Sequence, residues 1–408
     1  MIEKPKRWFT CTPVAFGGGS DFFARDSGLL CRGLLAIGVE ARAIMPGEAL
    51  PDDERDLIRT RYENLHSANW WRGLNADGVV LYAWGHPRYR NIAKAIREAG
   101  VFLVLNQDHG GLVSPLADWR GWLEEQWILT GSGNSLRSRF GFIKRVIRGL
   151  TVGVFAIDPL RAAHLRCGDV IACVSPLAAS HFRKLCRLYG GDSLAGRVRV
   201  IPHPVETLFG FDDSTPAKAN RIVCIGRWQD ATQKRPQLMQ QVMASLLDQE
   251  TEVHFDICGQ ATEDLVKWHA SLPEPFRARI VLHGLLPSRT ALAKLLQNAR
   301  IFYSPSAFES FGIAAGEALC SGCSVVAARS PSMASFEWFV SKDSGRLAPH
   351  DGIQWHVDAL RQELATWNAG QRNPLTISRH WQHELAAPNV ASRVLVLKAA
   401  HETSHGTH

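Results

Sequence analysis

Short apolar segments alternate with longer helical patterns along nearly the whole chain. Each apolar segment is three to six residues long, as is typical of a buried strand. Between them, stretches such as Asp21–Ile37 and Arg88–Ala99 repeat their apolar residues at helical spacing. Strands that alternate with helices predict a mostly parallel sheet covered by helices, the α/β class. In the first half the predicted strands are Trp8–Cys11, Ala41–Met45, Gly78–Ala83, Val101–Leu105, Asp169–Val174 and Val198–Ile201.

The alternation stops after the sixth predicted strand and then begins again. Pro202 and Pro204 precede a polar stretch, 212–220, that is typical of a linker. The strands predicted beyond it are Arg221–Ile225, Val253–Cys258, Arg279–Leu282, Arg300–Tyr303, Cys323–Ala327 and Gly345–Leu347.

The chain is therefore predicted to form two doubly wound, Rossmann-like domains, 1–210 and 211–385. Residues 386–408 are expected to form a helix near Val390–His401 that crosses back, followed by a disordered tail. Ligands of doubly wound sheets bind at the carboxyl ends of the strands. We therefore expect both domains to turn their binding loops into a cleft between them.

Composition agrees with an ordinary folded protein. The 408 residues are 46% hydrophobic and 21% charged, which excludes a disordered chain. Met1–Arg7 leads into only a short apolar run, and no apolar run is long enough for a transmembrane helix. We therefore expect a cytoplasmic protein without a secretory signal.

The nine cysteines are an odd number spread over the chain, and they are predicted to be free, buried thiols in a reducing compartment. Cys320 and Cys323 form a CxxC pair, but no second pair of metal ligands lies nearby. The preferred interpretation is that they end a helix and begin a strand.

The net charge of +7 comes from one part of the sequence. Residues 136–187 carry ten Lys and Arg against two Asp, so the remainder of the chain is nearly neutral. Within 137–157 the cations alternate with apolar residues such as Phe140 and Ile143. One interpretation is a solvated basic helix. The other is peripheral contact with an anionic membrane, or a surface for a phosphorylated, lipid-linked acceptor. No recognition motif accompanies the charge, so no nucleic-acid partner is expected.

The segment Ser304–Gly322 holds the most informative motif. A predicted strand ends at a Pro-containing loop, and a helix of small residues begins near Gly312. Backbone N–H groups at such a helix start suit an anion, particularly where Gly permits close approach. Glu317 lies within this apolar helix and needs a partner, which ligand hydroxyls can supply. Glu309 and Glu317 are spaced to hold two ends of an elongated ligand; the alternative is a solvated Glu309 and a helix-cap contact for Glu317.

A second cluster opens the C-terminal half. Arg227 follows Gly226 at the end of a predicted strand, and Lys234 comes seven residues later, just before a helix. The Arg fork and the Lys point charge can together neutralise a diphosphate. The alternative is an exposed basic loop. No Asp-x-Asp ends an apolar strand, so a Mg²⁺ or Mn²⁺ site is not expected.

Two loops of the N-terminal half give weaker signals. Gly17–Gly19 follow the first strand and resemble a phosphate loop, but the spacing of a dinucleotide fingerprint is missing. A nicotinamide-dependent dehydrogenase is therefore disfavoured. Asp108 and His109 follow another strand, where a His can hydrogen-bond a ligand or move a proton near neutral pH. The alternative is a surface histidine.

Together these motifs resemble the retaining glycosyltransferases of family four, the glycosyl transferases group 1, which have the GT-B fold. The match is strongest at the E-x7-E segment of Glu309–Glu317 and extends to Gly226, Arg227 and Lys234 and to Val198–Val205. The resemblance implies transfer of a hexose-type sugar from a UDP- or GDP-sugar to a hydroxyl acceptor. It also implies retention of the anomeric configuration, with the leaving phosphate accepting the acceptor's proton, and no metal ion or other cofactor.

The resemblance further implies roles for individual residues. Glu309 would lie against the donor sugar, and Glu317 would bind the ribose hydroxyls. Arg227 and Lys234 would hold the diphosphate, and His109 would contact the sugar or the acceptor. Glu309, His109, Arg227 and Lys234 are thus the candidate catalytic residues. Further donor contacts would come from Gly18 and Gly19, at the phosphate, and from Ser310, Phe311, Gly312 and Ile313, at the sugar.

The chain departs from the family pattern in three places. Asp108-His109 reverses the usual order of His and Asp, His203-Pro204 replaces Asn-Gly, and Arg235 replaces the Gly after Lys234. Two other functions stay open: a catalytically inactive GT-B protein that binds a sugar nucleotide, and a GT-B sugar-nucleotide epimerase. The acceptor, a glycan, a lipid-linked molecule or a small molecule, is expected on the N-terminal domain.

Overall fold

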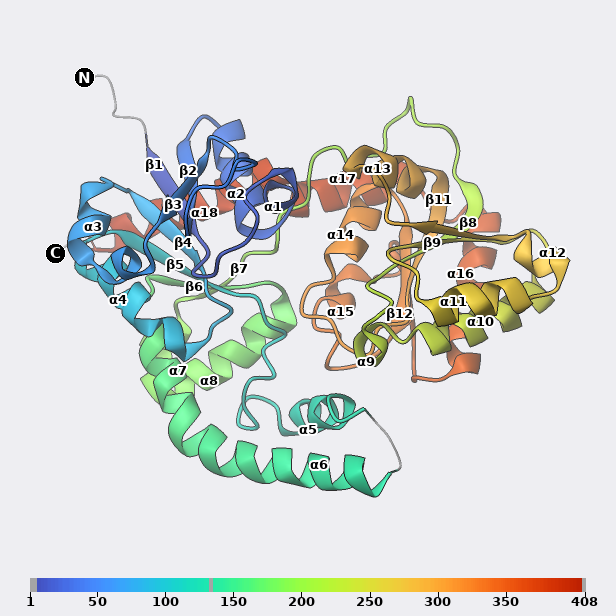
Figure 1. Cartoon of the computed structure of the whole chain (residues 1–408), viewed down its shortest axis with the longest axis horizontal. Helices are drawn as coiled ribbons and strands as arrows, with labels where there is room; N and C mark the ends of the chain where they lie inside the picture. Colours follow the sequence, from blue (N-terminus) through green and yellow to red (C-terminus); the bar gives the residue numbers. More distant parts are fainter. Residues whose placement is uncertain (1–5, 132–134, 406–408) are drawn as a thin grey trace. The chain divides into compact units, whose positions relative to one another are not determined.

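The computed structural model describes residues 6–131 and 135–405 of the chain. The chain divides into two compact units (Figure 1). Unit 1 comprises residues 1–126, 134–206 and 384–408, and unit 2 comprises residues 127–133 and 207–383. Each unit contains one parallel sheet with helices around it. The predicted α/β class with two parallel sheets is therefore confirmed.

Seven strands form the sheet of unit 1, in the order β3-β2-β1-β4-β5-β6-β7. The six strands predicted in this half are all present. Only β3 was missed: it is a short edge strand, and three of its four residues are half-buried, so it has no continuous apolar run. The strands are β1 Arg7–Cys11, β2 Glu40–Pro46, β3 Leu57–Thr60, β4 Gly78–Tyr82, β5 Phe102–Gln107, β6 Val170–Cys173 and β7 Val198–Val200.

The helix predicted at Asp21–Ile37 is two helices, α1 (Ser20–Phe23) and α2 (Asp26–Ala36). The run breaks at Asp26, whose φ is +50°. The Asp26 carboxylate thus lies at the start of α2, where the helix dipole favours negative charge.

The other helical segments of unit 1 are η1 Tyr62–His66, α3 Ala68–Gly73, η2 Pro87–Tyr89, α4 Arg90–Glu98, α6 Leu136–Arg148, the π-helix η3 Gly149–Ile157, α7 Asp158–Leu165 and α8 Pro176–Ala195; α5 spans Trp119–Ile128.

The end of the chain completes the core of unit 1. Helix α18 (Ala387–His405) packs against α2, and its Val390 and Val394 are fully buried. The two helices approach closely, because a Cβ added to Gly33 would lie 2.4 Å from the carbonyl oxygen of Ala387. The helix predicted near Val390–His401 is thus present and longer than expected. It continues to His405, and the rest of the predicted disordered tail, 406–408, lies outside the described residues.

Six strands form the sheet of unit 2, in the order β10-β9-β8-β11-β12-β13, and each of them was predicted within two residues. They are β8 Ala219–Ile225, β9 His254–Cys258, β10 Ile280–Gly284, β11 Ala299–Ser304, β12 Ser324–Ala328 and β13 Gly345–Ala348. The helices are α9 Ala231–Lys234, α10 Pro236–Gln249, α11 Glu263–Ser271, α12 Glu274–Arg277, α13 Arg289–Asn298, α14 Ile313–Cys320, α15 Phe336–Phe339, α16 Ile353–Asn368 and α17 Pro374–Leu385.

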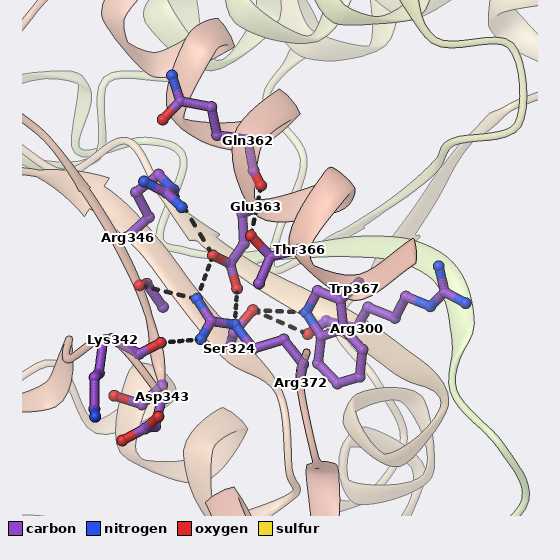
Figure 2. A network of polar contacts seen from close by, with 12 residues as sticks. Arg300, Ser324, Lys342, Asp343, Arg346, Gln362, Glu363, Thr366, Trp367 and Arg372 are labelled. Atoms are coloured by element: carbon purple, nitrogen blue, oxygen red, sulfur yellow. Dashed lines mark hydrogen bonds and ion pairs between the residues drawn. The ribbon is translucent and has the colours of Figure 1, made fainter. Parts of the chain in front are cut away.

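A buried ion pair lies at the amino ends of β11, β12 and β13. The Arg372 guanidinium donates to both carboxylate oxygens of Glu363, over 2.6 and 2.7 Å, and to the carbonyl oxygens of Lys342 and Gly345 (Figure 2). Both charged side chains are at most 2% exposed. The pair therefore ties α16, which carries Glu363, to the segment that enters β13.

All nine cysteines are free and buried, as predicted. Burial raises the pKa of the Cys31 and Cys258 thiols to about 12, so these thiols stay protonated at neutral pH. Cys320 ends α14 and Cys323 precedes β12, as the sequence predicted.

Within the described ranges, the chain has no helix that combines the length and the apolar character needed to span a bilayer.

Candidate functional site

The loop that follows β11 brings Glu309 to the carboxyl end of the unit 2 sheet. Its backbone is fixed on one side, because Glu309 N–H donates to the Ser332 carbonyl over 2.9 Å and Ala334 N–H donates to the Glu309 carbonyl over 3.1 Å. On the other side, Ala307 N–H donates to the carbonyl of Gln233 over 2.8 Å. The loop is thus held between two neighbouring segments.

Lys234 and Glu309 form an ion pair in this loop. The Lys234 ammonium contacts Glu309 Oε1, and the Ser306 hydroxyl donates to the same oxygen over 3.0 Å. The two charged side chains are 15% and 13% exposed. The structure thus brings together two residues that the sequence predicted from separate motifs.

Arg235, which stands where the family pattern has Gly, has the backbone conformation of a glycine. Its φ of +45° is a left-handed conformation, which Gly adopts without a steric penalty. The Arg235 side chain donates to the carbonyl oxygens of Pro305 (2.7 Å) and Ser306 (3.2 Å) and pairs with Asp351. Arg235 therefore ties the turn between α9 and α10 to the loop that carries Glu309.

Arg227 lies at the end of β8, as predicted, with its side chain in solvent. The side chain is 77% exposed, donates to the Gln233 amide oxygen over 3.2 Å, and lies 3.9 Å from Asp230. Gln233 in turn donates to the Phe308 carbonyl over 3.1 Å. Arg227 is thus near the Lys234–Glu309 pair through Gln233, while its guanidinium stays accessible.

Helix α14 begins at a tight turn that only glycine fits. Gly312 has φ +78°, and a Cβ there would lie 2.9 Å from the ring of Phe336. The Phe311 side chain is buried against Phe339, with ring centroids 5.2 Å apart. The backbone of Phe311 is thus the part left for a ligand, and its contact with the sugar stays a prediction. The N–H groups of Ile313 and Ala314 precede the first hydrogen bonds of α14, which Ala315 and Gly316 N–H make to the Gly312 carbonyl.

Glu317 has an ion-pair partner that the sequence did not predict. Its buried side chain forms an ion pair with Arg289, the first residue of α13. Arg289 also lies over the ring of Phe209, with its guanidinium carbon 4.7 Å from the ring centroid. A buried carboxylate in an apolar helix requires a cation or several donors. That requirement was visible in the sequence, but no spacing rule pointed to Arg289.

In unit 1, Gly17–Gly19 line a pocket of about 760 Å³. Gly18 permits a close approach, because a Cβ there would lie 2.2 Å from a carboxylate oxygen of Asp53. Asp53 is held by Arg59, which donates to both of its oxygens over 2.9 and 2.7 Å, and these hydrogen bonds lower the pKa of the Asp53 carboxyl. The glycine loop is therefore fixed against the segment before β3.

The lining of this pocket is acidic and aromatic. It includes four carboxylates and one guanidinium, those of Asp21, Asp26, Asp52, Asp108 and Arg25. It also includes the aromatic rings of Phe16, Phe22, Tyr82 and Trp84. The carboxylates oppose an approaching phosphate, so the lining by itself does not favour the predicted phosphate contact at Gly18 and Gly19.

Two departures from the family pattern meet beneath this pocket. His203 Nε2 lies 2.9 Å from Asp108 Oδ1, and His203 Nδ1 lies 3.6 Å from Asp26 Oδ1. The imidazole is buried and stacks on Tyr82, with centroids 6.2 Å apart. Burial alone would lower the pKa of His203, but the two carboxylates outweigh burial and raise it to about 9. His203 is therefore an imidazolium between two pocket carboxylates at neutral pH.

His109 takes a different position. Asp108 lines the pocket, whereas His109 lies outside its lining. The His109 Nδ1 accepts from Gly111 N–H over 3.1 Å, and burial lowers the pKa of His109 to about 4. The imidazole is therefore neutral at pH 7. The proposed role of His109 at the sugar or acceptor stays a prediction.

Stability should fall as His203 loses its proton. The folded-state pKa of about 9 exceeds the ordinary value of 6.5, so protonated His203 favours the fold. This contribution is complete below about pH 6.5 and is lost as the pH rises through 9. We expect the free energy of unfolding to drop by about 2–3 kcal/mol between pH 6 and pH 10. Urea unfolding across this range measures the drop.

The matched variants for this measurement are His203→Gln and His350→Gln. The first removes the titrating group and should flatten the pH dependence. The second replaces an exposed histidine of unit 2 and should leave it as in the wild type. Equal slopes for the wild type and His203→Gln would refute the role of His203.

The predicted site residues thus fall into two groups. Arg227, Lys234, Glu309–Ile313 and Glu317 all lie on unit 2, around the carboxyl ends of β8 and β11 and the start of α14. Gly18, Gly19 and His109 lie on unit 1. No cluster of three or more His, Cys, Asp or Glu side chains suited to a metal ion occurs among the residues that the structure describes.

Part of the chain matches a known family. Residues 219–366 match the family model described as glycosyl transferases group 1. This range contains Arg227, Lys234, Glu309 and Glu317, together with Arg289, the partner of Glu317. No curated protein sequence matches the chain at a significant level.

Solved structures resemble nearly the whole chain at low identity. The lipopolysaccharide outer core galactosyltransferase WaaB, in its apo form, has a TM-score of 0.61 and 13% identity, over 97% of this chain and 99% of its own. HepE from Anabaena, in complex with UDP and glucose, has a TM-score of 0.59 and 14% identity, over 97% and 100%. A Listeria monocytogenes protein proposed to be a UDP-N-acetylglucosamine 2-epimerase has a TM-score of 0.56 and 12% identity, over 99% and 98%. The fold is therefore GT-B, as predicted, and at this identity the matches show the fold alone.

Proposed function

We propose that the chain transfers a hexose-type sugar from a nucleotide-diphosphate sugar to a hydroxyl acceptor, with retention and without a metal ion. The observation that carries this proposal is the Lys234–Glu309 pair, at the carboxyl end of β11 and ahead of α14. It puts a cation for a phosphate beside a carboxylate for sugar hydroxyls. The group 1 match over residues 219–366 and the UDP bound to HepE support the same class of donor.

The diphosphate end of the donor is assigned to the two cations. Lys234 is held in place by Glu309, whereas the exposed Arg227 guanidinium can turn toward a phosphate. The N–H groups at the start of α14 add a partial positive charge. Together they stabilise the negative charge that grows on the leaving phosphate.

The sugar end is assigned to Glu309 and to the backbone of Ser310–Ile313. Lys234 and Ser306 both contact Oε1 of Glu309. A carboxylate has two acceptor oxygens, so Glu309 can also accept hydrogen bonds from sugar hydroxyls. Glu317 would accept hydrogen bonds from the ribose hydroxyls while Arg289 balances its charge. The residue pairs thus match the two polyhydroxyl parts of a nucleotide sugar.

In the proposed transfer, the bond between the anomeric carbon and the phosphate oxygen breaks, and the acceptor oxygen bonds to the same carbon on the same face. The proton of the acceptor hydroxyl passes to the leaving phosphate oxygen. The chain then needs no basic side chain at the acceptor, and its task is to position the reactants and stabilise charge. The pocket of unit 1 suits an acceptor, because its aromatic rings can stack on a sugar and its carboxylates accept hydroxyl hydrogen bonds.

A donor screen tests the proposal. The purified chain is incubated with individual UDP- and GDP-sugars, and slow hydrolysis is followed by mass spectrometry. We expect one donor to release its nucleoside diphosphate. Binding without turnover, with any acceptor supplied, would indicate an inactive binding protein, and a rearranged sugar nucleotide would indicate an epimerase. Absence of both binding and turnover for every donor would refute the proposal.

Retention and metal independence are tested with the donor found. The anomeric configuration of the first product is read by NMR, and the proposal requires that it equal that of the donor. Turnover is then compared with and without EDTA, and we expect equal rates. An inverted product, or activity that EDTA abolishes, would refute the corresponding part of the proposal.

A further inference from the structure

The solvent-facing side of α6 is apolar. Leu136, Phe140, Ile143, Ile147 and Leu150 follow one another at steps of four and three residues, which puts them on one face of the helix. We call this set the apolar stripe. The side chains of the apolar stripe are exposed, Leu136 to 86% and Phe140 to 72%. In the π-helix η3, which continues α6 toward α7 (Figure 1), Phe155 is 80% exposed.

Other residues of α6 and η3 are partly covered. Phe142, Val146 and Val154 are half-buried. Gly149 lies against Trp122, because a Cβ there would be 2.2 Å from the indole ring. The Tyr189 hydroxyl of α8 donates to the Val154 carbonyl over 3.0 Å. The apolar stripe therefore belongs to a helix whose continuation, η3, is fixed to unit 1, and the stripe itself faces solvent.

Cations flank the apolar stripe, and no acid does. Residues 136–157 contain five basic residues and no Asp or Glu, and all five are exposed. In the part of the chain that the structure describes, none of the five forms a salt bridge. They are Arg137, Arg139, Lys144, Arg145 and Arg148.

The outward face is also hollowed. A groove of about 370 Å³ lies along it and is lined by Phe140, Ile143 and Ile147 together with Lys144, Arg148, Thr151 and Val152. The apolar stems of Lys144 and Arg148 thus extend the apolar surface while their charged groups reach outward. This is the arrangement of a helix that lies in a membrane interface.

We propose that α6 and η3 dock on an anionic lipid bilayer, with the apolar stripe at the acyl boundary and the cations nearest to it, Arg137, Arg139, Lys144 and Arg148, among the headgroups. A bilayer offers a uniform negative surface with apolar chains below it, which matches cations of one sign around an apolar centre. Residues 149–157 contain no charged side chain, so exposed Phe155 can insert further than α6. The proposal does not depend on the activity proposed above.

Vesicle co-sedimentation of the full chain tests the docking. The vesicles are phosphatidylcholine with 30 mol% phosphatidylglycerol, and phosphatidylcholine alone, at 0.1 M NaCl. We expect the chain to sediment with the anionic vesicles and to stay in solution with the neutral ones. Binding should fall at least tenfold at 0.5 M NaCl, because salt screens the cations.

Matched variants separate the two contributions. Arg137→Gln combined with Arg148→Gln should weaken binding by roughly thirtyfold, at about fivefold for each cation. The control is Lys94→Gln combined with Arg187→Gln, which removes two exposed cations of unit 1 that pair with acids and should change binding less than twofold. Phe140→Asp combined with Ile147→Asp should abolish binding, whereas Leu285→Asp, at a residue 74% exposed on unit 2, should not.

Each outcome decides the proposal. Circular dichroism shows first that the variants are folded. Absence of sedimentation with anionic vesicles, or equal binding to both vesicles, overturns the proposal. A dimer in sedimentation velocity that Phe140→Asp dissociates also overturns it, because a second copy of the chain would then cover the apolar stripe. The donor screen is unaffected by any of these results, so the two proposals fail separately.

Discussion

The Lys234→Ala variant should hydrolyse its nucleotide sugar about 10²–10³ times more slowly than the wild type, mainly through kcat. Lys234 is placed to neutralise the charge that grows on the leaving diphosphate, and that charge is largest in the transition state. Glu309→Gln should lose about as much, because it removes the charge that fixes Lys234 and weakens the hold on the sugar hydroxyls. Release of nucleoside diphosphate, measured at saturating donor, gives both rates.

The matched control is Lys267→Ala. Lys267 also pairs with a glutamate of unit 2, Glu263, but both side chains are at least 70% exposed. An exposed pair of this kind contributes little, so Lys267→Ala should retain full activity. Combining Lys234→Ala with Glu309→Gln should cost less than the sum of the two single changes, because the residues act as one unit. A rate for Lys234→Ala within threefold of the wild type, in a folded variant, would contradict the assignment.

The second large effect concerns stability. Arg372→Ala should lower the free energy of unfolding by about 3–5 kcal/mol. It leaves the fully buried Glu363 carboxylate with the more distant guanidinium of Arg346, whose Nε lies 4.0 Å from Glu363 Oε2. It also removes the donors that the carbonyl oxygens of Lys342 and Gly345 use (Figure 2). Urea unfolding followed by circular dichroism measures the loss.

Two further variants show whether the loss of the close partner of Glu363 is the cause. Arg372→Met combined with Glu363→Leu removes both charges and should be more stable than Arg372→Ala. Arg277→Ala breaks the exposed pair with Glu274 and should change stability by less than about 1 kcal/mol. The ion pair lies at the amino ends of the strands, away from Lys234 and Glu309, so the folded Arg372→Ala chain should keep its activity. If the double variant were less stable than Arg372→Ala, the buried charge of Glu363 would not explain the loss.

The sheets could be predicted because buried parallel strands are short and continuously apolar. Adjacent residues on both faces of a central strand are fully buried, as are Val223 and Cys224 in β8 and Val325 and Val326 in β12. Such a strand can be predicted from its own residues, without knowing which strands lie beside it. β3 lacks this signal, because it is an edge strand and mostly half-buried. The sequence also did not predict the break at Asp26 between α1 and α2. A positive φ at a residue other than glycine does not change the spacing of apolar residues along the sequence.

The candidate site was predictable in its residue types but not in its pairings. Lys234 and Glu309 stood in separate motifs, and their contact depends on how two loops meet at one end of the sheet. The sequence did not predict a role for Arg289, because its partner, Glu317, lies 28 residues away on another helix. The contact between His203 and Asp108 joins two positions that the sequence marked only as departures from a family pattern. Such pairs are set by tertiary packing, which one sequence does not encode locally.

The return of α18 to unit 1 has a consequence for how the protein is made. Unit 1 needs Val390 and Val394 in its core, yet roughly 180 residues of unit 2 are translated between its two parts. At about 5–20 residues per second, a ribosome takes on the order of 10–40 seconds to cross them. During this time the apolar surface of α2 beside Gly33 is without the helix that later covers it. The first unit to be started is therefore the last to be finished, and chains that terminate early would carry this surface exposed, as a target for chaperones and proteases.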